Sequence, residues 1–140
     1  MEIPEEEILN FPNGILAFEE FSRFVLLTEK DESVFHWLQS LDDPQLAFLV
    51  VDSADVMSDY QPALLSSEVN AVFGSTDEEN LKLYCICTIP ANHPEKMTIN
   101  LQGPLVIDMG KKLGGQFISN DESHQVRTPL LELVEAIESA

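Results

Sequence analysis

Proline and glycine interrupt the apolar segments of this chain so often that few runs are long enough for a helix. The apolar runs between these breaks have the length of β-strands, whereas helices need about ten residues or more. Turn sequences such as Phe11-Pro12-Asn13-Gly14 and Asp42-Asp43-Pro44 separate the runs. Proline presets φ in such turns, and Asn-Gly tolerates a positive φ. The pattern therefore predicts a β-rich fold.

Short apolar segments without intervening helices argue against a parallel βαβ sheet. The run Leu46–Val51 is continuously apolar, which predicts a central strand buried on both faces. The fold class we expect is mainly β, with antiparallel strands forming a partly closed barrel or a sandwich. The predicted strands are residues 7–11, 24–28, 34–40, 46–51, 81–89, 97–101, 105–108 and 115–119.

Two helices are expected beside the strands. One short central helix covers residues 65–73, with Ser66 or Ser67 as N-cap and Gly74 as its stop. A C-terminal helix begins with Thr128 as N-cap and Pro129 at the first helical position. Its apolar stripe, which is expected to dock on the sheet, consists of Leu130, Leu133, Val134 and Ile137.

The charge of the chain limits its partners. Its 140 residues suit a single domain over residues 1–140, and 44% apolar residues can build a core. With 25 acidic and 7 basic residues, the net charge of −18 disfavours binding to nucleic acid or anionic membranes. Such a field attracts a basic protein, although solubility alone is an alternative explanation. Without a membrane-length apolar run or a signal-peptide pattern, the protein is expected in the cytoplasm.

Signatures of catalysis and of cofactor binding are not found. Phosphate-loop, nucleophile-elbow, zinc-protease and calcium-loop spacings do not occur, and no cofactor or metal is predicted. Gly110–Gly115 is interpreted as a hairpin loop. Cys85 and Cys87 lie two residues apart in a predicted strand, where their Cα atoms are too far apart for a comfortable disulfide. Two small reduced residues, in the core or on one face of the strand, are favoured.

Several motifs in order along the chain resemble the flagellar assembly factor family FliW. Phe11–Glu19 is similar to the opening signature of that family, and Phe35–Asp52 to its second and most specific one. Further matches are Asp59-Tyr60, Thr98–Ile107, Gly115–Phe117, and Arg127 with Pro129-Leu130. The chain departs from the family pattern at Ala17, where Gly is usual, at Ser53, where Pro is frequent, and at His124, near a frequent Tyr.

The resemblance implies a β-barrel-like fold without enzymatic activity, and two protein partners. These are flagellin and CsrA, a small RNA-binding translational repressor. Free flagellin would hold the protein. After flagellin is exported, the released protein would bind and antagonise CsrA, which relieves repression of flagellin mRNA translation. The free protein is expected to be a monomer. The alternative is a small acidic metal-dependent enzyme, which would gather Asp, Glu and His side chains in one pocket.

Polar residues inside the family signatures are the expected partner-binding positions. Phe35 and Trp37 are aromatic residues suited to anchoring an interface, but a core position is favoured for a single Trp. Local backbone bonding is the competing explanation for Gln39, Asn100 and Gln102. The predicted partner-binding residues are Gln39, Asp42, Asp43, Asp59, Tyr60, Asn100 and Gln102.

Overall fold

The computed structural model describes residues 4–28, 34–57, 59–74, 80–89 and 92–129, and these are mainly β-strands. Two α-helices, α1 (Ser53–Val56) and α2 (Ser66–Phe73), and two short 3-10 helices, η1 (Glu5–Glu7) and η3 (Pro94–Lys96), accompany the strands. The strands are β1 (Leu9–Asn10), β2 (Arg23–Leu27), β3 (Phe35–Ser40), β4 (Ala47–Asp52), β5 (Leu81–Thr88), β6 (Thr98–Ile99), β7 (Leu105–Asp108), β8 (Leu113–Gln116) and β9 (Thr128–Pro129).

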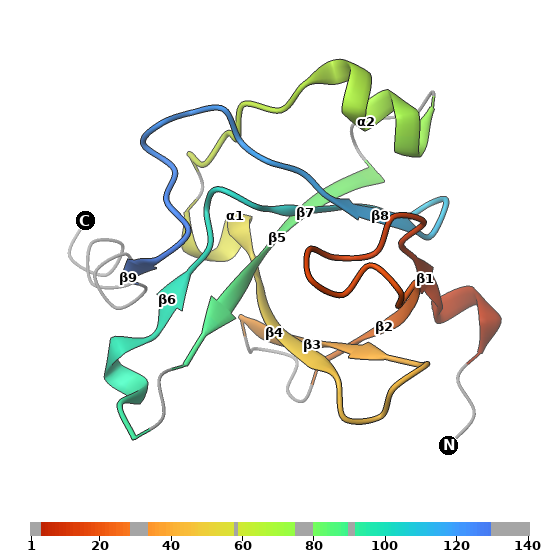
Figure 1. Cartoon of the computed structure of the whole chain (residues 1–140), viewed down its shortest axis with the longest axis horizontal. Coiled ribbons are helices and arrows are strands. Elements are labelled where there is room, and N and C mark those ends of the chain that lie inside the picture. Colours follow the sequence, from red (N-terminus) through yellow and green to blue (C-terminus); the bar gives the residue numbers. More distant parts are fainter. Residues whose placement is uncertain (1–3, 29–33, 58, 75–79, 90–91, 130–140) are drawn as a thin grey trace.

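The strands close into a barrel. Neighbours follow the order β4-β3-β2-β1-β8-β7-β5, and a β4–β5 pairing closes the ring. All of these pairs are antiparallel except β1–β8, which is parallel and joins Asn10 to Leu113. Beside the ring, β6 pairs with both β5 and β9 (Figure 1). The predicted mainly β barrel is confirmed, with full closure and one parallel pair in place of an all-antiparallel sheet.

The interior of the barrel is filled by side chains from nearly every strand. Because successive residues of a strand point to opposite faces, Phe24, Leu38 and Val50 point inward from neighbouring strands. Phe11 and Ile15 enter the same cluster from the loop after β1. That loop begins with the predicted turn, in which the Gly14 N–H donates to the Phe11 carbonyl at 2.9 Å and Gly14 has a φ of 66°.

Two further apolar clusters cover parts of the outside of the barrel. One lies over β4 and β5 and includes Val56 of α1, Tyr60 and Ile99. The other lies beneath α2 and contains Phe73, Val106 and Phe117. In Figure 1, α2 lies on the side of β7 and β8, while β3 and β4 form the opposite side of the barrel.

Strand β8 begins earlier than the sequence suggested. The prediction placed a loop over Gly110–Gly115 and a strand over 115–119, whereas β8 covers Leu113–Gln116 and the turn precedes Leu113. Gly114 belongs to the strand because the Phe11 ring packs against its backbone. A Cβ on Gly114 would lie 2.5 Å from Phe11 Cζ. The glycine thus serves close packing rather than a turn.

The helix predictions were correct in part. α2 covers nearly all of the predicted central helix and ends at Gly74. Its N-cap is Leu65, without a side-chain cap bond, so the Ser66 or Ser67 assignment was wrong. Thr128 and Pro129 were predicted to start a helix, but they form β9 against β6. Pairing of their backbone with Thr98 and Ile99 explains this difference. The rest of the predicted C-terminal helix lies outside the described residues.

Strand β4 is buried on both faces only near its end. The consecutive residues Val50 and Val51 are both fully buried. Val50 lies inside the barrel, and Val51 belongs to the outer cluster that contains Val56. Ala47, Phe48 and Leu49 are half-buried. The expectation of burial on both faces therefore holds for the part of β4 that pairs with β5.

Candidate protein-binding surface

The β3–β4 turn is organised by the side chains of Gln39 and Ser40. The Gln39 amide donates to the carbonyls of Ser40 and Leu46, each at 3.0 Å, and the Ser40 hydroxyl accepts from the Asp42 and Asp43 N–H groups. Asp43 accepts from the Gln45 N–H at 2.9 Å. These bonds satisfy backbone groups that a tight turn leaves unpaired. Gln39 and Asp43 therefore have structural roles that do not depend on a partner.

Asp42 is the more exposed of the two predicted turn carboxylates. It accepts hydrogen bonds from the Arg23 guanidinium, the shorter at 2.6 Å. These hydrogen bonds and the charge of Arg23 lower the pKa of Asp42 below its usual value. An exposed ion pair of this kind contributes little to stability but leaves a carboxylate on the surface.

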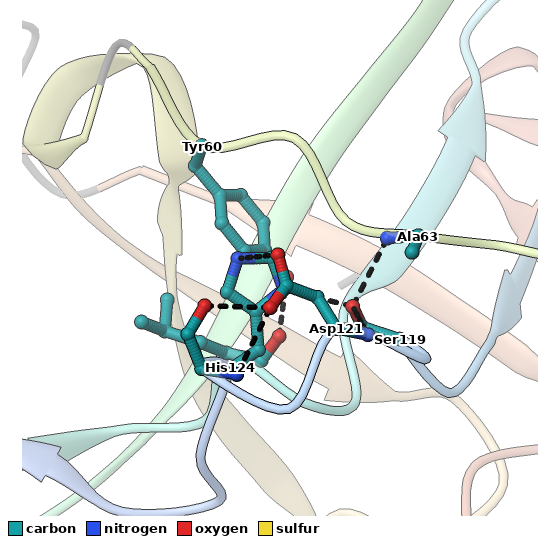
Figure 2. A network of polar contacts seen from close by, with 7 residues as sticks. Tyr60, Ala63, Ser119, Asp121 and His124 are labelled. Atoms are coloured by element: carbon teal, nitrogen blue, oxygen red, sulfur yellow. Dashed lines mark hydrogen bonds and ion pairs between the residues drawn. The ribbon is translucent and has the colours of Figure 1, made fainter.

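Tyr60 is buried in a polar network that joins distant parts of the chain. Its hydroxyl donates to the Leu101 carbonyl at 2.5 Å, and its ring stands edge-on to His124 at 4.9 Å (Figure 2). Burial raises the pKa of the Tyr60 hydroxyl. Nearby, Asn100 Oδ1 accepts from the N–H groups of Gln102 and Gly103, which closes a turn. These signature residues thus shape the loops around Leu101.

Ser119, His124 and Asp121 make contacts that superficially resemble a hydrolytic triad. The Ser119 hydroxyl lies 2.8 Å from His124 Nδ1, and Asp121 lies 3.8 Å from His124 Nε2. However, the Ser119 oxygen already accepts from the Ala63 and Asp121 N–H groups, and the residue is only 3% exposed. A nucleophile needs a free, accessible oxygen, so the arrangement fastens loops together rather than attacking a substrate.

The predicted partner-binding residues fall into two separate groups. Gln39, Asp42 and Asp43 lie before β4, whereas Tyr60 follows α1 at the other end of β4 and lies near Asn100 and Gln102. The five residue steps along β4 span about 17 Å. Asp59 is exposed and lies next to Tyr60. The structure therefore does not gather all the predicted residues in one patch.

An outward row of apolar side chains lies close to the first group. Leu27 pairs with Trp37, and Trp37 pairs with Leu49 across β2, β3 and β4. Their neighbours Leu26, Leu38 and Phe48 belong to the interior cluster, so this Trp37 row points outward. Trp37 and Leu27 are each 37% exposed, so the core position favoured for Trp37 was wrong. A tryptophan on such a surface is a typical interface anchor.

Gln116 has a role that the sequence analysis missed. Its amide oxygen accepts from the Leu16 N–H at 2.9 Å, and its amide nitrogen donates to the Gly103 carbonyl at 3.0 Å. One side chain thereby joins the loop after β1 to the loop before β7. The motif Gly115–Phe117 marked this residue, but only the fold shows which loops it connects.

The described residues contain no group of three or more His, Cys, Asp or Glu side chains placed to hold a metal ion. The clustering expected of the metal-enzyme alternative is thus missing from this part of the chain. Cys85 and Cys87 are free, as predicted, and both are buried. Burial raises the pKa of each thiol to about 12. Among the helices described, none has the length and apolar character needed to cross a lipid bilayer.

Comparison with known proteins gives one consistent family. Residues 1–130 match the family model described as FliW protein. The flagellar assembly factor FliW of Leptospira interrogans serovar Lai is 42% identical over 94% of this chain and 87% of its own length. That of Thermotoga petrophila is 38% identical over 96% and 90%. A crystal structure of the flagellar assembly factor FliW superimposes with a TM-score of 0.81 at 32% identity, covering 93% of this chain and 89% of that one.

Proposed function

Because this chain belongs to the FliW family of flagellar assembly factors, we propose that it acts as a non-catalytic regulator with two protein partners. Flagellin holds the protein while flagellin is abundant in the cytoplasm. When flagellin is exported, the released protein binds a CsrA-type RNA-binding regulator and antagonises it. Translation of flagellin mRNA then resumes.

The exposed Trp37 row is the observation that most supports a binding role. Trp37 is an aromatic anchor flanked by aliphatic side chains, and the Asp42 carboxylate lies in the turn that follows the same strand. This combination suits a partner that is both apolar and basic. Gln39 points to the same side as Trp37 because the two residues are two apart in β3. We therefore place the binding surface on the outside of β2, β3 and β4.

The net charge of −18 supports antagonism of an RNA-binding protein in particular. A regulator that holds RNA needs cations, which an acidic surface attracts and thereby speeds association. The same charge repels RNA phosphates close to the bound regulator. Binding of this protein would thus both occupy the regulator and disfavour its RNA.

A competition pull-down tests the proposed function. The protein is immobilised, loaded with CsrA, and then exposed to flagellin, and bound CsrA is measured. We expect CsrA to bind and flagellin to release it. Failure to bind either protein would contradict the proposal.

Two sets of variants test the proposed surface. Trp37→Ala should weaken CsrA binding at least about tenfold, as expected for an interface anchor. The matched control Ile89→Ala removes an apolar side chain that is also exposed, and should leave binding unchanged. Neutralising Asp42, Asp43 and Asp59 to Asn should reduce displacement of RNA from CsrA. Unchanged displacement in that triple variant would rule out the electrostatic contribution.

A further inference from the structure

Residues of α2 and β8 line a small pocket. These two elements lie on the side of the barrel opposite β3 and β4, the strands that carry Trp37 and Leu49 (Figure 1). Its volume is about 260 Å³, and its lining includes the apolar residues Ala71, Val72 and Phe117 and the polar residues Asn13, Glu68 and Gln116. Sites for small-molecule ligands are usually larger, about 300–1,000 Å³. The size of this pocket suits one inserted side chain better than a whole small molecule.

Two lining residues of the pocket, Gln116 and Phe117, are held in place by contacts with other parts of the chain. Gln116 is fixed at both ends by its hydrogen bonds to Leu16 and Gly103. Phe117 is 5% exposed and packs against Phe73 of α2, with ring centroids 6.0 Å apart. A cavity with walls this constrained requires little rearrangement to accept a partner, which favours binding.

Three exposed apolar residues are adjacent in the chain, or joined by a hydrogen bond, to α2 or to residues that line the pocket. Leu16, whose N–H is bonded to the lining residue Gln116, is 58% exposed. Ile118 directly follows the lining residue Phe117, and Leu65 directly precedes α2; both are also largely exposed. Apolar residues around a concave site extend the area that a protein segment can cover.

An acidic side chain lines the pocket. Glu68 is exposed and contributes to the lining. The Glu19 backbone lies close to Gly14, the neighbour of the lining residue Asn13, but the Glu19 carboxylate accepts from the Ala17 N–H at 3.3 Å. The Lys111 ammonium donates to the Phe73 carbonyl at 2.7 Å, which directs that cation to the C-terminal end of α2. The Glu68 carboxylate, on a protein of net charge −18, complements a basic partner.

From this geometry we propose that the pocket between α2 and β8 is a second docking site, for a basic segment of a partner protein that inserts one large apolar side chain beside Val72 and Phe117. Basic residues beside the inserted side chain face Glu68. This site does not depend on the function proposed for the Trp37 row, because the two surfaces lie on opposite sides of the barrel.

Nuclear magnetic resonance with defined peptides tests the site. The probe is acetyl-Lys-Lys-Phe-Lys-Lys-amide, and the comparison peptide has Ala in place of Phe. We expect the Phe peptide to shift the Ala71 and Val72 methyl signals and the Gln116 side-chain amide. It should bind about tenfold more tightly than the Ala peptide, because burial of an aromatic side chain contributes at least that factor. Equal affinity of the two peptides would overturn the proposal.

Variants on α2 locate the binding. Ala71→Phe fills the pocket and should abolish the difference between the two peptides, whereas the control Asn70→Phe, outside the lining, should preserve it. Glu68→Gln keeps the shape of the pocket and should weaken both peptides by several-fold. Peptide-induced shifts that centre on Trp37 rather than on Val72 would overturn the proposal. Loss of flagellin or CsrA binding through Trp37→Ala, with the peptide response intact, would affect only the proposed function.

Discussion

The ring of Tyr60 stands edge-on to the imidazole of His124, with their centroids 4.9 Å apart, while the Tyr60 hydroxyl donates to Leu101. Tyr60 was expected to contact a partner, but it is only 5% exposed. Its hydroxyl and its ring thus serve the interior of this protein. Through these contacts Tyr60 joins the loops around Leu101 and His124.

Tyr60→Phe should therefore reduce stability without affecting partner affinity. The variant leaves the buried Leu101 carbonyl without its donor, which costs about 1–3 kcal/mol. Urea unfolding measures the loss, and CsrA binding is measured on the same preparation. Unchanged stability together with weaker binding would show that the hydroxyl contacts the partner.

The sequence predicted the strands far better than the polar contacts. Phe24–Thr28, Val34–Ser40 and Leu81–Ile89 each match an observed strand to within about a residue at either end, because apolar runs mark strands directly. Helix α1 was missed, since four residues carry no helical period. The parallel β1–β8 pair was also missed, because it joins residues that are far apart in the chain.

The candidate site was harder to predict, because a polar residue in a family signature has either of two roles. It contacts a partner, or it holds its own turn in shape. Gln39 and Asn100 bond to backbone groups of their own turns, and that role alone accounts for their place in a motif. A core position was favoured for Trp37 because it is the single tryptophan, and its strand gave no indication of which face is covered. Only the closed barrel shows that Leu38 points inward and Trp37 outward.

Ser119→Ala should destabilise the protein more than Tyr60→Phe does. The Ser119 oxygen accepts from the Ala63 and Asp121 N–H groups, and its hydroxyl also bonds to His124. Removing it takes a partner from the buried His124 imidazole and from two part-buried N–H groups, so we expect a loss of about 2–3 kcal/mol in urea unfolding.

Ser123→Ala is the matched control for this change. Ser123 is exposed and its hydroxyl donates to the exposed Asp121 carboxylate at 2.7 Å. Its effect should stay within about 0.5 kcal/mol. Equal losses at positions 119 and 123 would contradict the fastening role of the buried hydroxyl.

Ala17→Gly should stabilise the protein. Ala17 stands where glycine is usual in the FliW signature, yet it keeps a φ of 74°. A left-handed conformation costs a residue with a Cβ about 1–2 kcal/mol, which exceeds the extra chain entropy of glycine. We expect a gain of about 0.5–1 kcal/mol in urea unfolding. The same change at Ala54, which lies in α1, should have the opposite sign.

The buried thiols predict a loss of stability at alkaline pH. Burial raises the pKa of Cys85 and Cys87 to about 12, whereas an unfolded thiol titrates near pH 8.5. Between these values the unfolded state binds fewer protons than the folded state. The free energy of unfolding therefore falls as pH rises, by up to about 1.4 kcal/mol per pH unit for each thiol.

Urea unfolding at about pH 8, 9 and 10 measures this slope, because these pH values span the titration of an unfolded thiol. The Cys85→Ala, Cys87→Ala double variant should be less stable at pH 8 but should lose much less stability between pH 8 and pH 10. Tyr84→Phe is the control, because burial raises the pKa of Tyr84 to about 12 and its unfolded phenol ionises only near pH 10. That variant should keep the wild-type slope below pH 10. If the double cysteine variant instead keeps the full slope, groups other than the two thiols cause the alkaline loss.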